Sequence, residues 1–95
     1  MMYKRIKLTI SGKVQGVFYR AYTKEKALEI GVTGWVKNNT NNTVSVTIEG
    51  EKKKVEEMII HCKKGSPQSN VTDIKIAEEP FQNEFSTFII RETYD

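Results

Sequence analysis

Apolar residues recur along this chain with two different periods, and the order of the two periods is what most restricts the fold. Ile6, Leu8 and Ile10 alternate with polar residues, which is the pattern of a strand with one buried face. Residues 51–64 instead carry apolar residues three and four positions apart, which places them on one face of a helix. These residues are Val55, Met58, Ile59 and Cys62. Because neither segment suits the other geometry, the chain must combine strands with helices.

A second helix is predicted over residues 20–30, which are rich in helix formers and contain no proline. Gly31 follows it and suits a left-handed helix cap, and Gly65 takes the same place after residues 51–64, with Pro67 behind it. The apolar residues expected to form the buried stripe of the first helix are Ala21, Ala27, Leu28 and Ile30. This stripe is less regular than that of the helix over residues 51–64.

The remaining segments have strand character. Residues 33–38 and 43–49 flank the turn residues NTNN, and asparagine tolerates a positive φ, so the two strands are predicted to form a hairpin. Alternation over residues 72–76 predicts another strand, which Pro80 ends. Residues 87–91 predict a short final strand.

We therefore predict a single domain over residues 1–95 with an α+β fold. The order of elements is that of the ferredoxin-like βαββαβ two-layer sandwich, with a mostly antiparallel sheet and an added short C-terminal strand. Right-handed crossovers would place both helices on one face of the sheet. At 95 residues the chain is near the smallest size that buries a sizeable core without disulfides or metals.

Charge is unevenly distributed, although the formal net charge is only +3. Residues 1–26 hold seven basic residues against one acidic residue, whereas residues 71–95 hold two basic residues against six acidic ones. A positive N-terminal third raises the local concentration of anions. This charge would attract an anion to a site built by this part of the chain, although for any single lysine a solubilising surface position is the simpler interpretation.

Several classes of site and partner lack support in the sequence. The single cysteine, Cys62, cannot form an internal disulfide, and it cannot supply a four-ligand metal site together with the single histidine, His61. No apolar run reaches the length of a membrane span, and the first residues lack the features of a signal peptide. We expect a cytoplasmic monomer with no cofactor, no metal and no membrane partner.

The stretch GKVQGVFYR joins the first predicted strand to the first predicted helix. Gly12 and Gly16 allow backbone angles closed to other residues, so several amide N–H groups can point into one concavity at the positive end of the helix. Arg20 adds a planar guanidinium that can bind two oxygens of one anion. A phosphate or carboxylate fits such a site, but a tight turn followed by a solvated arginine fits the same residues. A Walker loop is absent, because Val17 and Phe18 follow the second glycine.

The loop and a second motif together resemble the acylphosphatase family. GKVQGVFYR, preceded by Ile10 and Ser11, is similar to the first signature of that family, and GWVKN at residues 34–38 is similar to the second. The similarity continues through the turn at residues 65–67 to the end of the chain. Tyr19 stands where the family usually has Phe or Met, and Asn42 where it usually has Gly.

The resemblance implies metal-independent hydrolysis of acyl phosphates to a carboxylate and inorganic phosphate by in-line attack of water. Arg20 matches the phosphate-binding arginine of the family, and Asn38 matches the asparagine that orients the attacking water. The phosphate-binding loop would consist of Gln15, Gly16, Val17, Phe18, Tyr19 and Arg20. Without the second motif, residue type and position would favour a turn asparagine at Asn38.

Three other functions share features with this sequence. A ferredoxin-like nucleic-acid-binding module shares the predicted order of elements and the sequence pI of about 9.0, but TVSVTIE carries no aromatic residue that could stack on a base. Binding of a phosphorylated metabolite without catalysis would use the same loop. A cysteine phosphatase would need an arginine where Gln68 stands and its cysteine in a loop, whereas Cys62 falls on the apolar face of a helix. Hydrolysis of an acyl phosphate, with no nucleic acid bound, is the function we predict.

Overall fold

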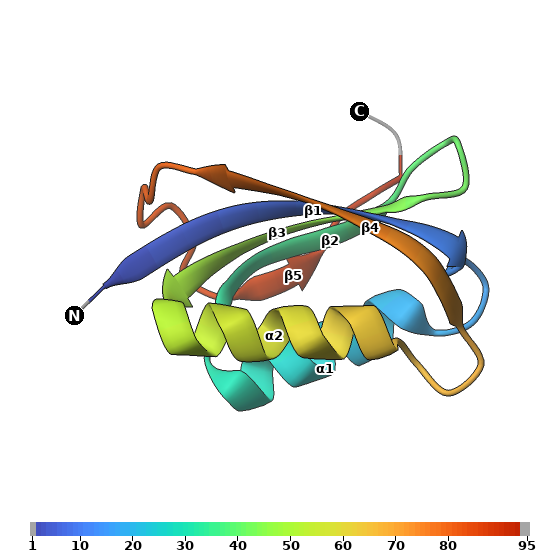
Figure 1. The fold of residues 1–95 in the computed structure, drawn as a ribbon, viewed down its shortest axis with the longest axis horizontal. Coiled ribbons are helices and arrows are strands. Elements are labelled where there is room, and N and C mark those ends of the chain that lie inside the picture. Colours follow the sequence, from blue (N-terminus) through green and yellow to red (C-terminus); the bar gives the residue numbers. More distant parts are fainter. Residues whose placement is uncertain (1, 94–95) are drawn as a thin grey trace.

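The computed structural model describes residues 2–93 and contains five strands and two helices. In chain order they are β1 (Tyr3–Lys13), α1 (Tyr19–Ile30), β2 (Thr33–Asn38), β3 (Val44–Glu51), α2 (Lys52–Lys64), β4 (Asn70–Glu79) and β5 (Phe88–Ile90). The strands form one sheet, and both helices cover the same face of it (Figure 1). The predicted α+β two-layer sandwich is confirmed.

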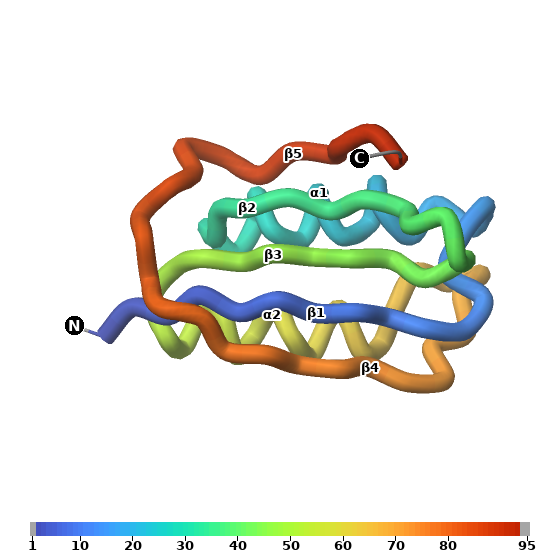
Figure 2. Tube along the Cα trace, turned by 90° about the horizontal axis from the view of Figure 1, so that it is seen from above, coloured from blue at the N-terminus to red at the C-terminus, as the bar shows by residue number. Residues whose placement is uncertain are grey.

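The strand order in the sheet is β4-β1-β3-β2-β5. The pairs β1–β3, β1–β4 and β2–β3 are antiparallel, whereas β5 pairs with β2 in parallel. The segment that follows β4 crosses one end of the sheet and brings β5 to the outer side of β2 (Figure 2). β5 is therefore the predicted additional strand, and it lengthens the ferredoxin-like sheet at the β2 edge.

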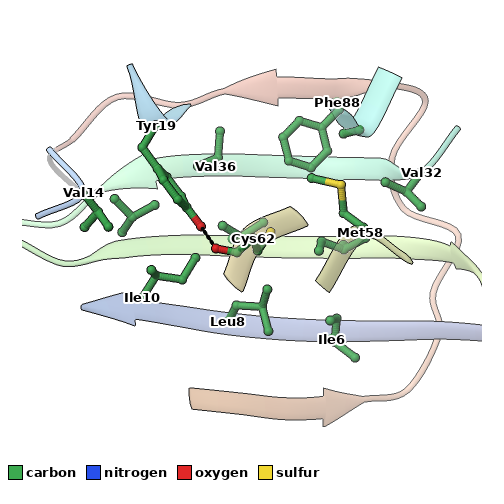
Figure 3. Close-up of a cluster of buried hydrophobic side chains, with 14 of the residues drawn as sticks. Ile6, Leu8, Ile10, Val14, Tyr19, Val32, Val36, Met58, Cys62 and Phe88 are labelled. Atoms are coloured by element: carbon green, nitrogen blue, oxygen red, sulfur yellow. Dashed lines mark hydrogen bonds between the residues drawn. The ribbon is translucent and has the colours of Figure 1, made fainter. Parts of the chain in front are cut away.

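The core lies between the sheet and the helices (Figure 3). Ile6, Leu8 and Ile10 of β1 are buried, as the period-two pattern predicts. On the predicted apolar face of α2, Val55, Met58 and Cys62 are buried and Ile59 is partly buried. Burial raises the pKa of the Cys62 thiol to about 12, so this cysteine is an uncharged core residue at neutral pH. Both helices end at glycines with positive φ, 94° at Gly31 and 76° at Gly65.

The buried face of α1 differs from the predicted stripe. Ala27 is buried and Ile30 is partly buried, but Ala21 and Leu28 are exposed, and the buried face is completed by Tyr19 and Thr23. Both polar side chains are satisfied, because the Thr23 hydroxyl donates to the Tyr19 carbonyl at 2.8 Å and the Tyr19 hydroxyl donates to the Cys62 carbonyl at 2.7 Å (Figure 3). Hydrogen bonding of this kind is invisible to a hydropathy pattern, which explains the wrong prediction.

A buried carboxylate fixes the segment that leads to β5. The Glu49 side chain on β3 is almost fully buried, and its two oxygens accept hydrogen bonds from the backbone amides of Gln82, Asn83 and Glu84 at 2.7, 3.1 and 2.8 Å. The Arg5 guanidinium lies 3.5 Å from the same carboxylate. Burial alone would raise the pKa of Glu49, but these amides and the guanidinium outweigh it and lower the pKa below its ordinary value.

We expect Glu49→Gln to lower the free energy of unfolding at pH 7 by about 2–3 kcal/mol, the value of hydrogen bonds to a buried charge. Either orientation of the glutamine amide places an NH₂ group against a backbone N–H. The folded-state pKa of Glu49 is lowered, so its stabilising effect is complete above the ordinary pKa of 4.5 and is lost as the pH falls through the folded-state value. Urea unfolding between pH 3 and pH 7 measures both effects.

The matched control for this prediction is Glu57→Gln, on the exposed face of α2. Its free energy of unfolding should stay within about 0.5 kcal/mol of the wild-type value. The Glu49 variant should also lose less stability on acidification than the wild type. Parallel pH profiles for the wild type and Glu49→Gln would contradict the assignment.

Candidate active site

The two glycines near the loop between β1 and α1 have different structural roles. Gly12 lies at a bulge in β1, and a Cβ there would lie 2.1 Å from the carbonyl oxygen of Asn70. It therefore permits the close approach of β1 and β4 and is not part of a concavity. Gly16, with φ of 73°, has open space where its side chain would be and is the glycine that shapes the loop itself.

The loop ends in a second left-handed residue. Phe18 has φ of 60° and ψ of 22° and immediately precedes the first residue of α1. A phenylalanine in this region is uncommon and strained, so the surrounding structure must hold it there. Among residues 2–93, the backbone amides of Gln15, Gly16, Val17 and Phe18 have no hydrogen-bond acceptor. Together with the first-turn amides of α1 they form a group of unpaired donors at the positive end of the helix.

Three hydrogen bonds anchor this loop to the rest of the molecule. The Val17 carbonyl accepts from the buried Ser66 hydroxyl at 2.8 Å, in the turn after α2. The Gln15 side-chain amide donates to the carbonyls of Asn39 and Thr43 at 2.9 and 3.0 Å, across the hairpin between β2 and β3. Since the N–H and C=O of one peptide point in opposite directions, the bond to Ser66 directs the Phe18 amide away from the core.

A cavity of about 330 Å³ opens beside this loop at the start of α1. Its lining consists of Val14, Gly16, Phe18, Tyr19, Arg20, Ala21 and Ile90. Arg20 has no ion pair or hydrogen bond within residues 2–93. In contrast, Arg5 forms ion pairs with three glutamates, and the Arg91 guanidinium lies 4.7 Å from the centre of the Trp35 ring. The guanidinium at the cavity therefore has no partner within residues 2–93 that would compete with an external anion.

Asn38 is the last residue of β2, and its side-chain oxygen is buried without a hydrogen-bond partner in the part of the chain that the structure describes. The neighbouring Asn39 is different, because its amide nitrogen donates to the hydroxyls of Thr43 and Ser45 at 2.9 and 2.8 Å. Gln15 ties the loop to the carbonyl of Asn39, so Asn38 lies one residue from that link. Asn38 is not among the residues that line the cavity.

Sequence reasoning missed three contributions to this site. The Gln15 side chain and Ser66 hold the loop in place, and Ile90 of β5 lines the cavity. Both the motif and the turn at residues 65–67 are visible in the sequence, but hydrogen bonds between them are not. No local signal identifies Ile90, which comes from a strand 70 positions after Arg20.

Residues 2–93 contain no group of three or more His, Cys, Asp or Glu side chains placed to hold a metal ion. Neither helix in that range is long and apolar enough to cross a membrane.

Fold and site together define a ferredoxin-like α+β protein whose first helix begins at a loop with amides that have no acceptor within residues 2–93, beside a cavity lined by Arg20. The acylphosphatase family model matches residues 6–90, which is most of the chain. This chain belongs to the acylphosphatase family.

Known acylphosphatases are similar to this chain over nearly its whole length. The chain is 45% identical over 87 residues to an acylphosphatase of Syntrophobacter fumaroxidans, covering 92% of this chain and 90% of that protein. Among solved structures, it is similar to an acylphosphatase from Coxiella burnetii with a TM-score of 0.88 and 35% identity, covering 94% of this chain and 93% of that one. An acylphosphatase from Bacillus subtilis gives a TM-score of 0.89 and 31% identity, covering 95% and 99%. The sequence relative therefore supports membership of the family, and the solved structures support the fold.

Proposed function

We propose that this protein is an acylphosphatase, a hydrolase that cleaves the carboxyl–phosphate bond of an acyl phosphate to give a carboxylate and inorganic phosphate. The observation that carries the proposal is the cavity beside the loop, whose amides and Arg20 have no hydrogen-bond or ion-pair partner within residues 2–93. Main-chain amides at a helix N-terminus and a guanidinium are donors that suit a tetrahedral oxyanion. An acyl phosphate has a good leaving group, so catalysis needs positioning and charge stabilisation more than a strong acid.

The phosphoryl group would be held by main-chain amides and one side chain. The donors are the amides of Gln15, Gly16, Val17, Phe18, Tyr19 and Arg20 together with the Arg20 guanidinium. Gly16 and Phe18 supply the left-handed backbone that turns the amides in one direction. Because the loop is anchored by Ser66 and Gln15, these donors need little reorganisation as charge develops on the phosphoryl oxygens.

Asn38 would orient the attacking water. Asn38 does not line the cavity, but its side-chain oxygen is buried without a partner within residues 2–93 and can accept a hydrogen bond from a water molecule held in line with the phosphorus. An amide does not titrate near neutral pH, so it cannot remove the proton. As the water oxygen bonds to phosphorus, the acyl oxygen leaves with its electron pair, and the proton of the water passes to a phosphoryl oxygen of the substrate.

We infer that residues 1–95 act as one domain and as a cytoplasmic monomer, and that nucleic acid is not a partner. The shared core of sheet and helices supports the first inference. The acidic residues at positions 71–95 oppose a continuous basic surface, which supports the last.

Hydrolysis of benzoyl phosphate in excess EDTA tests the proposed function. We expect turnover with a kcat of roughly 1–1,000 s⁻¹, the range of ordinary enzymes, and the same rate with and without chelator. Released phosphate and the ultraviolet absorbance of benzoyl phosphate measure it. Binding of the substrate with no turnover would favour a phospho-metabolite-binding module, and loss of activity in EDTA would contradict the metal-free mechanism.

A further inference from the structure

The cavity at the candidate active site has one wall from the C-terminal strand. Ile90 of β5 lines it together with residues of the loop and of α1. In the parallel register Ile90 pairs with Val36, which is fully buried, so Ile90 faces the helices, whereas Ile89 pairs with Trp35 and faces the other side of the sheet. β5 also ends at the same end of the molecule as the loop between β1 and α1 (Figure 2).

β5 is held firmly enough to position that wall. The Phe88 side chain is buried in the core, the Gly34 amide donates to the Thr87 carbonyl at 3.0 Å, and the Arg91 amide donates to the Val36 carbonyl at 2.9 Å. Ile90 lies between these two main-chain hydrogen bonds. Its side chain lines the cavity and is 41% exposed.

Phe18 supplies a second exposed apolar surface at the same cavity. Its side chain is 76% exposed, and it makes no stacking or cation–π contact within residues 2–93. An exposed aromatic ring beside a cavity is apolar surface that a bound ligand can cover. Among the described residues that line the cavity, Arg20 is the only charged one, and it would bind the phosphate. A second charged group on the substrate would therefore have no partner of its own in the lining.

We propose that Ile90 and Phe18 form the acyl-binding part of the site, and that this enzyme selects acyl phosphates whose acyl group is apolar over those whose acyl group carries a second charge. The inference rests on the proposed function. The phosphate would bind to the loop amides and Arg20, and the acyl group would cover the exposed surfaces of Ile90 and Phe18. Burying these surfaces in the complex supplies the selectivity.

The test measures kcat/KM for acetyl, butyryl, succinyl and benzoyl phosphate, each divided by the spontaneous hydrolysis rate of that substrate. We expect the wild type to prefer benzoyl over acetyl phosphate and butyryl over succinyl phosphate. Ile90→Ala should lower the benzoyl-to-acetyl ratio about 10-fold, near the lower limit for losing apolar contacts in a closed pocket, because Ile90 is partly exposed. Phe18→Ala should lower the same ratio.

The matched control is Ile89→Ala on the same strand, where the side chain is 47% exposed but does not line the cavity. It should keep the wild-type ratio. Thermal unfolding of both isoleucine variants shows whether β5 is destabilised, and inhibition by inorganic phosphate shows whether the phosphate site is intact. Together they distinguish loss of the Ile90 contact from destabilisation of β5. Equal ratios in the wild type and Ile90→Ala, or an equal drop in Ile89→Ala, would overturn the inference while leaving acyl-phosphate hydrolysis intact. Absence of turnover on all four substrates would instead overturn the proposed function.

Discussion

Replacing Arg20 with alanine is expected to lower kcat/KM for benzoyl phosphate by at least about 100-fold, the usual cost of losing one preorganised oxyanion donor. The physical reason is that Arg20 is the one charged residue in the cavity lining and has no other partner within residues 2–93. For the same reason the fold should not depend on it. Circular dichroism and thermal unfolding should match the wild type, and steady-state hydrolysis measures the loss.

Two further variants sharpen this result. Arg20→Lys keeps the charge but loses the planar pair of donors, so it should recover only part of the activity. Arg91→Ala removes a guanidinium that lies over Trp35, outside the cavity lining, and should keep activity within about threefold of the wild type. Near-normal turnover by Arg20→Ala, or an equal loss in Arg91→Ala, would mean that Arg20 acts only through general electrostatics or not at all.

Local patterns were sufficient to predict most of the fold. The alternation of Ile6, Leu8 and Ile10 and the helical spacing of Val55, Met58 and Cys62 depend only on which face of each element is buried. Glycine and asparagine positions were equally informative, since Asn42 has φ of 70° in the predicted hairpin turn. Such signals are carried by residues close together in the chain.

Features that depend on distant residues could not be predicted in this way. Glu49 occupies what the period-two pattern treats as an outward position of β3, yet it is buried, because the segment at residues 82–84 folds over it. The sequence places Phe18 in the predicted loop but does not show that its backbone is left-handed and its ring exposed. The same limit applies to the site, whose loop is visible in the sequence and whose wall at Ile90 is not.

Replacing Asn38 with alanine is expected to lower kcat by about 100-fold or more while the inhibition constant of inorganic phosphate changes less than about threefold. The variant would keep every phosphate donor and lose only the group that orients the water. Because the Asn38 oxygen is buried without a partner in residues 2–93, its removal should leave the free energy of unfolding within about 1 kcal/mol of the wild-type value. Single-turnover hydrolysis, phosphate inhibition and urea unfolding measure the three quantities.

Asn39→Ala provides the contrast, because the two asparagines are adjacent but differ in what they bind. Loss of the Asn39 bonds to Thr43 and Ser45 should lower the free energy of unfolding by about 1–2 kcal/mol and affect turnover much less than Asn38→Ala does. A parallel loss of phosphate binding and turnover in Asn38→Ala would make Asn38 a structural residue of the turn. Retained binding with lost turnover requires that its side chain acts on the attacking water, since the amides and Arg20 already account for holding the phosphate.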